Sequence, residues 1–163
     1  MSVSRLIARP LLASGFLYGA TNALRNPDAM APKAASVADK VLPAAHKAGV
    51  PLPSDTATLV RINAGAQVLG GLALATGKAP RLGAALLAAS IVPTTVAGHA
   101  FWAESDPQAR KAQLLQFAKN LSMLGGVVIA AGDTDGQPGI AWRARRAAKD
   151  ARREAKLLRA KVT

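Results

Sequence analysis

The sequence lacks cysteine and is poor in acidic and aromatic residues. Without cysteine, its 163 residues can form no disulfide, no thiolate metal site and no redox-active thiol. Only 9 Asp and Glu stand against 21 Lys and Arg, which gives a formal net charge of +12. Aromatic residues make up 4% of the chain, although 50% of all residues are hydrophobic. A soluble domain of this length rarely combines so much apolar content with so much charge, so we expect the two to be segregated along the chain.

Residues suited to metal binding or acid–base catalysis are also scarce. The histidines are His46 and His99, and no Asp or Glu falls within the apolar stretches described below. This composition cannot supply an ordinary metal ligand set, a Ser-His-Asp triad or a catalytic pair of carboxylates. We therefore predict no metal site, no catalytic residue and no enzyme activity of the chain on its own.

Four apolar stretches predict helices that cross a membrane. The longest uncharged one, Leu82 to Ala103, matches the roughly 20 residues that span a bilayer. It is apolar on all sides, unlike the amphipathic helices of a soluble Ala-rich bundle, which is the alternative. The other three need one basic residue near an end, whose charge can reach the interface. They are Pro10 to Leu24, Ile62 to Gly77 and Asn120 to Gly132.

The basic residues outside these stretches predict the topology. One basic pair precedes the first stretch, another separates the second from the third, and a basic tail follows the fourth. The pairs are Arg5 with Arg9 and Lys78 with Arg81. Four crossings bring all three regions to one side, and segments rich in Lys and Arg face the cytoplasm. The predicted fold class is therefore all-α, a polytopic four-helix bundle in a bacterial plasma membrane with both termini cytoplasmic.

Two further patterns concern the packing of this bundle. Small residues four apart allow close helix contact in lipid, and such pairs occur in three of the stretches. They are Gly15 with Gly19, Ala66 with Gly70, and Ser122 with Gly126. The long outer segment 26–55 contains prolines at 27, 32, 43, 51 and 53. Between them, Ala34 to Ala48 predicts an amphipathic helix that caps the bundle or lies on the membrane surface.

The end of the chain is a separate basic segment. The stretch Gly132 to Gly139 is rich in Gly and Asp and breaks the fourth helix. We therefore divide the chain into a transmembrane domain, 1–135, and a basic amphipathic cytoplasmic helix, 136–163. Apolar residues of this helix recur at spacings of three and four, which is a heptad pattern. They are Ala141, Ala144, Ala148, Ala151, Ala155, Leu158 and Val162.

Three kinds of partner are considered for the basic helix. Anionic lipid is the first, because each Lys or Arg near such a surface contributes about 1 kcal/mol. The apolar stripe predicts instead a helix of a protein partner or of a second copy. Nucleic acid is not expected, because the segment has neither an aromatic platform nor a reading fold. The arginines expected to contact lipid or a partner are Arg143, Arg145, Arg146, Arg152, Arg153 and Arg159.

Polar residues of the apolar stretches gather in the outer half of the predicted bundle. Ionisable groups within a membrane are costly and so mark candidate sites. A neutral-to-cationic pocket there would suit a quinone head group or an anionic sulfur oxyanion. The structural alternative is that Arg61 and Lys119 reach lipid phosphates, while His99 beside Trp102 anchors the interface. The candidate ligand-binding residues are Arg61, Gln67, His99, Trp102, Gln116, Lys119 and Asn120.

Several motifs resemble those of the DoxX family of small membrane proteins. The sequence HAFW occupies residues 99–102, and QLLQFAKNLSMLGG occupies residues 113–126. The segment QVLGG at 67–71, followed by Gly77 and Arg81, adds to the resemblance. The first stretch fits more loosely, and together these motifs cover roughly residues 9–132. One departure is Gln67, where relatives often carry Glu.

The resemblance implies a four-helix protein of the plasma membrane. Members are associated with quinone-linked sulfur oxidation as a small membrane subunit, and similar actinobacterial proteins are linked to a complex with superoxide dismutase and a thiosulfate sulfurtransferase. We therefore expect an accessory membrane subunit or scaffold in a redox or sulfur-homeostasis complex. The alternatives are a quinone-binding subunit of a quinone-linked oxidoreductase, with quinone as the cofactor, and a purely structural subunit of a larger assembly.

Overall fold

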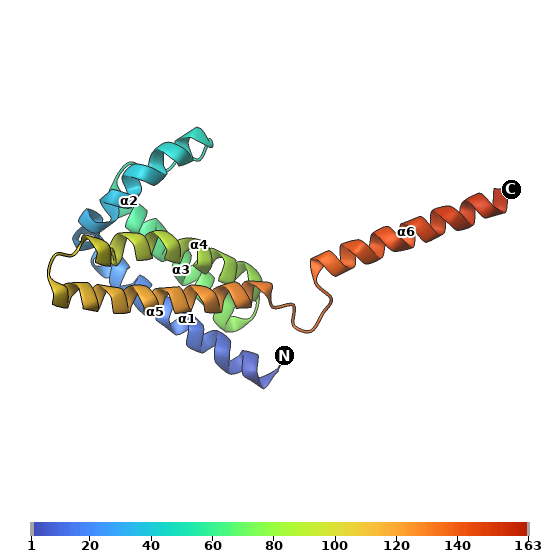
Figure 1. Ribbon diagram of the computed structural model, residues 1–163, viewed down its shortest axis with the longest axis horizontal. Helices are drawn as coiled ribbons and strands as arrows, with labels where there is room; N and C mark the ends of the chain where they lie inside the picture. Colours follow the sequence, from blue (N-terminus) through green and yellow to red (C-terminus); the bar gives the residue numbers. More distant parts are fainter. Residues whose placement is uncertain (1, 163) are drawn as a thin grey trace. The chain divides into compact units, whose positions relative to one another are not determined.

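The structure is a computed structural model that describes residues 2–162, apart from the side chains of residues 140 and 156–162. It is all-α, as predicted, and the described part contains six α-helices and one short 3-10 helix (Figure 1). The helices are α1, Val3–Arg25; α2, Pro27–Lys47; α3, Thr56–Thr76; α4, Pro80–Gly98; η1, Phe101–Ala103; α5, Pro107–Gly132; and α6, Ile140–Val162. The chain forms two compact units, Met1–Gly132 and Asp133–Thr163, and each is described by itself.

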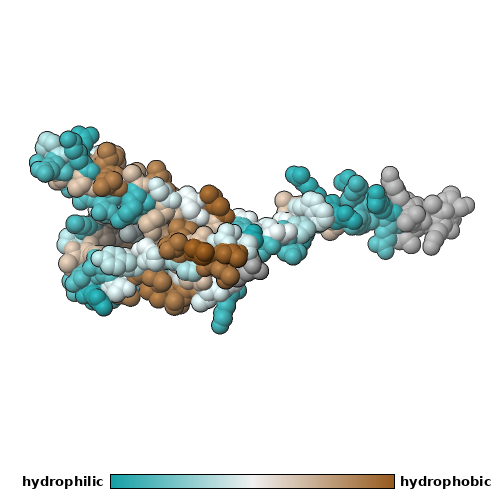
Figure 2. Space-filling model, turned by 90° about the horizontal axis from the view of Figure 1, so that it is seen from below, coloured by the Kyte–Doolittle hydropathy of each residue, from teal (hydrophilic) through white to brown (hydrophobic). Residues whose placement is uncertain are grey.

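Three segments of the first unit are long and apolar enough to cross a membrane. They are α3, the segment Pro80–Ala103 that joins α4 to η1, and α5. Helix α1 has a sufficient length of 23 residues but is not among them, because basic residues near both of its ends lower its hydropathy. Large apolar side chains face outward on these helices, and Leu82 and Ile129 are 76% and 77% exposed. Figure 2 shows hydrophobic residues over much of the visible side of this unit. Such a surface suits contact with lipid.

The long helices of the first unit pack in the order α1, α3, α4 and α5, and α5 also touches α1. Neighbours run antiparallel, since Gly15 of α1 lies beside Met123 of α5 and Leu12 lies beside Gly126. The start of α1, the α3–α4 turn and the end of α5 lie at one end, here called the basic end (Figure 1). The α1–α2 junction and η1 lie at the opposite end, here called the aromatic end. The buried core includes Ala13, Phe16, Leu74, Ala84, Leu87, Ile91 and Val127.

Glycines allow the backbones of α3 and α4 to come close together. A methyl group on Gly83 would lie 2.6 Å from the carbonyl oxygen of Gly70 and 2.9 Å from the backbone nitrogen of Leu74. Only hydrogen fits at that position. The small-residue pattern therefore marks a true contact at Gly70, and Gly126 also packs, against Leu12. Gly19 has no such contact, because nothing lies within 4 Å of the corresponding methyl position.

All five α-helices of the first unit begin earlier than the stretches predicted from the sequence, and the starts of α2 and α5 have an identifiable cause. Helix α2, expected over 34–48, starts at Pro27 and ends at Lys47. Proline suits the first turn of a helix, because its φ is already helical and the missing N–H has no partner there. Helix α5 starts at Pro107, well before the predicted apolar stretch that begins at Asn120. Asp106 caps this helix by accepting a 2.7 Å hydrogen bond from the Ala109 N–H.

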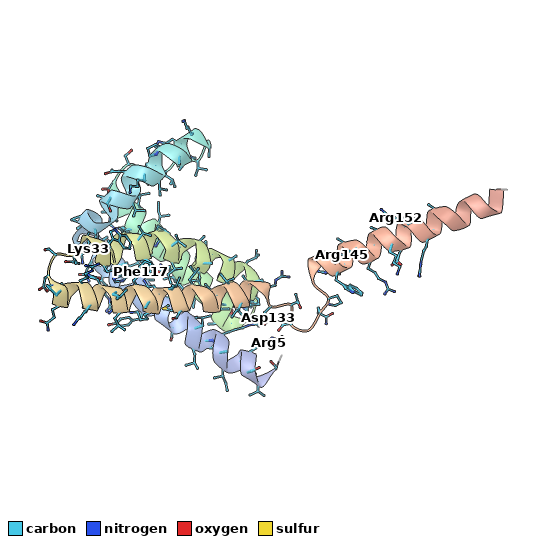
Figure 3. The ribbon with its side chains drawn as sticks, viewed as in Figure 1. Arg5, Lys33, Phe117, Asp133, Arg145 and Arg152 are labelled. Carbon is cyan, nitrogen blue, oxygen red and sulfur yellow. The ribbon has the colours of Figure 1, made fainter. Side chains whose placement is uncertain are left out.

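The second unit consists of a turn and the basic helix α6. Asp135 and Gly136 adopt positive φ angles of 57° and 80°, and α6 begins at residue 140. Its side chains from residue 141 to 155 are all exposed. Arg146 pairs with Asp150 at 3.5 Å and lies 5.6 Å from the ring centroid of Trp142. Arg145 and Arg152 extend from the helix (Figure 3).

Candidate functional site

Polar side chains of α3 and α4 form a hydrogen-bond network around Thr94. Its hydroxyl oxygen accepts hydrogen bonds from Asn63 Nδ2 at 2.9 Å and from Gln67 Nε2 at 3.3 Å. The same hydroxyl donates to the carbonyl oxygen of Ser90 at 2.8 Å. The one donor and two acceptor positions of the hydroxyl are therefore all used. Gln67 is only 6% exposed, so the network reaches into the interior of the unit.

Thr95 makes the equivalent connection toward α5. It accepts a hydrogen bond from Asn120 Nδ2 at 3.1 Å and donates to the carbonyl oxygen of Ile91 at 2.7 Å. Successive residues of a helix point about 100° apart, so Thr94 can bond to α3 while Thr95 bonds to α5. The two threonines thus join three helices by side-chain hydrogen bonds. Such bonds between membrane helices contribute about 0.6 kcal/mol on average.

His99 ends α4 and is held by α5. Its backbone N–H donates to the carbonyl oxygen of Thr95 at 3.0 Å. Its Nδ1 lies 2.9 Å from Oε1 of Gln113. Because an amide oxygen can only accept, Nδ1 is assigned as the donor, and in the neutral ring Nε2 is then an acceptor. The imidazole orientation is therefore set by the first turns of α5.

Three aromatic rings lie next to His99 at the aromatic end. Phe101 and Trp102 come from η1. Phe117, which is labelled in Figure 3, comes from α5. All three pairs are edge-to-face, with centroid distances of 5.1 Å for Phe101–Trp102, 5.4 Å for Phe101–Phe117 and 6.0 Å for Trp102–Phe117. Each such pair contributes about 0.5–1.5 kcal/mol beyond the area it buries. Trp102 is 54% exposed, which suits a residue at a membrane interface.

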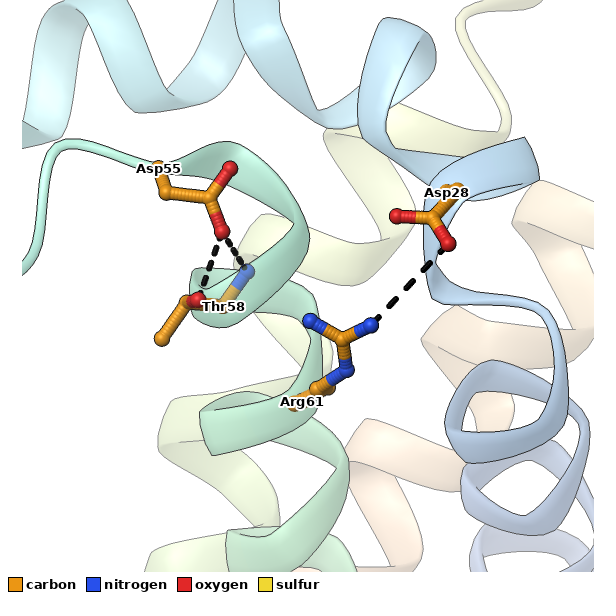
Figure 4. Close-up of polar contacts among 4 residues, drawn as sticks. All are labelled: Asp28, Asp55, Thr58 and Arg61. Carbon is orange, nitrogen blue, oxygen red and sulfur yellow. Dashed lines mark hydrogen bonds and ion pairs between the residues drawn. The ribbon is translucent and has the colours of Figure 1, made fainter.

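The start of α3 carries two polar contacts of its own (Figure 4). Arg61 Nη2 lies 3.9 Å from Oδ2 of Asp28 in α2, and because both side chains are exposed this pair contributes little to stability. Asp55 caps α3 by accepting hydrogen bonds from the hydroxyl and the backbone N–H of Thr58. These bonds hold the pKa of the Asp55 carboxyl below its ordinary value; the bond from the Thr58 hydroxyl has the largest effect and the bond from its backbone N–H the next largest.

The residues predicted from the sequence fall into three groups. Gln67, His99 and Asn120 take part in hydrogen bonds between helices. Trp102 belongs to the aromatic set. Three others do not join these contacts and are exposed, namely Arg61, Gln116 and Lys119. Ligand binding by any of them stays a prediction.

The hydrogen-bond and ring partners of these residues are not among the residues predicted from the sequence. They are Asn63, Thr94, Thr95, Gln113 and Phe117. One signal was available, because Asn63 and Gln67 are four residues apart and so share a helix face. A second was the Thr94-Thr95 pair within an otherwise apolar helix. Neither signal identifies which helix lies opposite.

The chemistry available to this set is hydrogen bonding and stacking. It offers amides, hydroxyls, one imidazole and aromatic rings, which come from α3, α4, η1 and α5. Among the residues that the structure describes, no group of three or more His, Asp or Glu could hold a metal ion. The arrangement suits a planar, uncharged head group that exchanges hydrogen bonds with these amides and with the imidazole and lies against an aromatic ring.

Comparison with known proteins adds one finding. The family model described as DoxX matches residues 4–100, which is more than half of the chain. This range runs from α1 to the end of α4, and so includes Gln67 and His99. The motif at 113–126 in α5 lies outside the matched range. No curated protein and no solved structure matches the chain.

Proposed function

Because the chain belongs to the DoxX family and is a multi-pass membrane protein, we propose that it is an accessory subunit or scaffold of a membrane-associated redox or sulfur-homeostasis complex. On this proposal it lies in a bacterial plasma membrane with both termini in the cytoplasm. Its own residues organise the assembly, and a partner carries out the chemistry.

The observation that carries this proposal is the exposure of the basic helix α6. Isolated helices are only marginally stable in water, and most gain their stability from packing of one face. Within its own unit, Asp133–Thr163, nothing buries the described side chains of α6 from residue 141 to 155. A surface outside this unit would supply that packing. Arg145 and Arg152 are seven residues apart and share one side of the helix, which suits an anionic lipid surface or an acidic protein.

The proposed orientation is supported by the arrangement of the first unit. Arg5 and Arg9 belong to the start of α1, Lys78 lies in the α3–α4 turn and Arg81 lies in the first turn of α4. These segments share the basic end with the end of α5 (Figure 1). Segments rich in Lys and Arg face the cytoplasm, so the basic end is the cytoplasmic one. Helix α1 then forms the fourth crossing, and the aromatic end faces outward.

The test is purification of the tagged full-length chain in mild detergent, with mass spectrometry of the proteins that accompany it. We expect a partner in a fixed ratio to the chain. The triple variant Arg145→Gln, Arg152→Gln, Arg153→Gln should lose that partner. A chain that purifies alone, or a partner retained fully by the Gln variant, would contradict docking of a protein partner through α6.

A matched variant separates the two surfaces that α6 could contact. Arg→Lys at the same three positions keeps the charge but loses the planar fork that binds carboxylates with two hydrogen bonds. Docking on lipid should therefore survive the Lys variant. Docking on acidic side chains of a protein should be weakened by it.

A second candidate function is quinone binding at the aromatic end. It is favoured by the position of the His99 imidazole and the Asn120 amide beside the three aromatic rings. On this alternative, quinone extracted with the purified chain should fall at least tenfold in His99→Leu, and Lys111→Gln, an exposed change on the same helix as Asn120, should retain it. An equal quinone content in both variants would exclude a site around His99.

A further inference from the structure

Helix α2 presents three different surfaces in sequence around its circumference. Ala38 is buried and lies on the side that packs against α3 and α4. Val37 and Val41 lie on the next side, and Val41 is 45% exposed. Lys33, Lys40 and Lys47 lie on the side after that, and all three are exposed. The apolar exposed strip thus lies between the packed side and the lysines.

The lysines form a straight row. They recur every seventh residue, which is about two turns, so they are about 10 Å apart along one side of the helix. The acids of α2 are Asp28 and Asp39, which are eleven residues, or about three turns, apart and so share one side of the helix. This side lies on the other flank of the packed side from the lysines, and Asp28 faces Arg61. The row is therefore a concentrated positive charge beside an exposed apolar strip. That combination is typical of helices that lie in the plane of a membrane interface.

The position of α2 in the unit brings this surface to the level of the membrane interface. A single residue, Asn26, separates it from α1, and it extends from the aromatic end of the unit (Figure 1). The partly exposed Trp102 lies at the same end, and tryptophan is enriched at membrane interfaces. Figure 3 shows Lys33 at this end of the unit. Because α2 is joined directly to helices of a membrane protein, its contact with lipid is effectively intramolecular.

We propose that α2 lies in the membrane interface and binds anionic phospholipids through Lys33, Lys40 and Lys47, while Val37 and Val41 enter the apolar layer. The occupant is the lipid of the membrane that holds the chain. Long lysine side chains can keep their ammonium groups at the phosphates while their stems cover apolar surface. Each lysine near an anionic surface strengthens binding by about fivefold. This inference concerns α2 alone and does not rest on the role proposed for α6.

The absence of cysteine makes the test direct, since one introduced thiol is the only one in the chain. Val41→Cys and, separately, Ser36→Cys on the opposite side of α2 are labelled with a nitroxide. The full-length protein is reconstituted into vesicles of phosphatidylcholine alone or mixed equally with phosphatidylglycerol. Collision with oxygen reports lipid, and collision with a nickel chelate reports water. In the anionic vesicles we expect the label at 41 to meet oxygen and the label at 36 to meet the chelate.

Paired variants test the role of the lysines. Lys33→Gln with Lys40→Gln should raise the chelate accessibility of the label at 41 severalfold in anionic vesicles. The control, Arg110→Gln with Lys111→Gln, removes the same charge from the exposed start of α5 and should change nothing. Lys33→Arg with Lys40→Arg should behave as the parent. These lysines are exposed, so the fold does not depend on them.

Three results would overturn the proposal. A water-exposed label at 41 in anionic vesicles would show that α2 does not enter the interface. If the accessibility of the label at 41 is the same in phosphatidylcholine alone as in anionic vesicles, and the Lys→Gln variant does not change it, anionic lipid is not recognised. Magnetic broadening between labels at 41 would show that a second copy covers this side of α2.

Discussion

The strongest consequence of the close contact between α3 and α4 is that Gly83→Ala should destabilise the bundle. The added methyl group would lie 2.6 Å from Gly70 O, 2.9 Å from the Cβ of Ala73 and 2.9 Å from the backbone nitrogen of Leu74. Carbon contacts are most favourable at about 3.5–4.0 Å, so the helices must separate by a substantial part of an ångström. Overpacking of this kind costs about 1–3 kcal/mol.

The matched control is Gly125→Ala in α5. Gly125 has nothing within 4 Å of its methyl position and, like Gly83, has no positive φ. In such an open position the substitution only removes the entropic disadvantage of glycine, which is about 0.5–1 kcal/mol in a helix. The same chemical change should therefore stabilise the protein at 125 and destabilise it at 83, with a difference of about 1.5–4 kcal/mol.

Thermal unfolding in mild detergent, followed by circular dichroism, measures the two changes against the parent. Gly126→Ala should fall between them, because the methyl group meets only the flexible end of Leu12 at 3.2 Å. The expected order of Tm is Gly125→Ala, Gly126→Ala and then Gly83→Ala. Equal Tm values for the substitutions at 83 and 125 would refute the inference that backbone contact between α3 and α4 limits stability.

Three further predictions concern polar contacts. Arg81 Nε donates to the carbonyl oxygen of Ala131 at 3.0 Å and so caps the end of α5; Arg81→Ala should lower the free energy of unfolding by about 1–2 kcal/mol, and Lys78→Ala in the same turn by less than about 0.5 kcal/mol, measured in the same detergent. A double-mutant cycle of Thr95→Val and Asn120→Leu should give a coupling energy of about 0.6–1.7 kcal/mol, and additive effects would show that their hydrogen bond contributes nothing. Because the pKa of Asp55 is lowered in the folded state, its stabilising contribution is present at neutral pH and is lost as the pH falls through that lowered pKa. Asp55→Asn keeps a capping side chain but cannot titrate, so the loss of Tm between neutral and acidic pH should be smaller than in the parent.

The all-α fold class could be predicted from the sequence because a helix surrounded by lipid can be apolar on all sides. A stretch such as Leu82 to Ala103 therefore stands out by length alone. The starts of the helices were harder to predict, since α5 begins within the charged segment that precedes its apolar part. The Asp106-Pro107 pair was the available signal, because Asp is a good N-cap and Pro suits the first helical position. The start of α2 at Pro27 follows the same rule.

The sequence predicted some residues of the polar site but not their hydrogen-bond partners, because the partners depend on which helices are neighbours. Sequence spacing identifies Gln67, His99 and Asn120 as unusual, but it cannot say that Gln67 bonds to α4 rather than to α1 or α5. That choice follows from the packing order α1, α3, α4, α5. It also follows from the rotation of α4, which turns Thr94 and Thr95 toward different helices.

The glycine contact and the hydrogen-bond network belong to one interface. Leu74, whose backbone nitrogen also contacts the methyl position of Gly83, lies about three turns from Asn63 on α3, and Gly83 lies about three turns from Thr94 on α4. Because packed helices are rigid, the depth at which the two glycines meet sets the register of both helices along their length. The close contact at Gly83 therefore aligns Asn63 with Thr94, which are joined at 2.9 Å, and the longer Gln67 side chain reaches the same hydroxyl at 3.3 Å. A substitution that separates the glycines should weaken these bonds as well, so stability and the geometry of the candidate site are expected to change together.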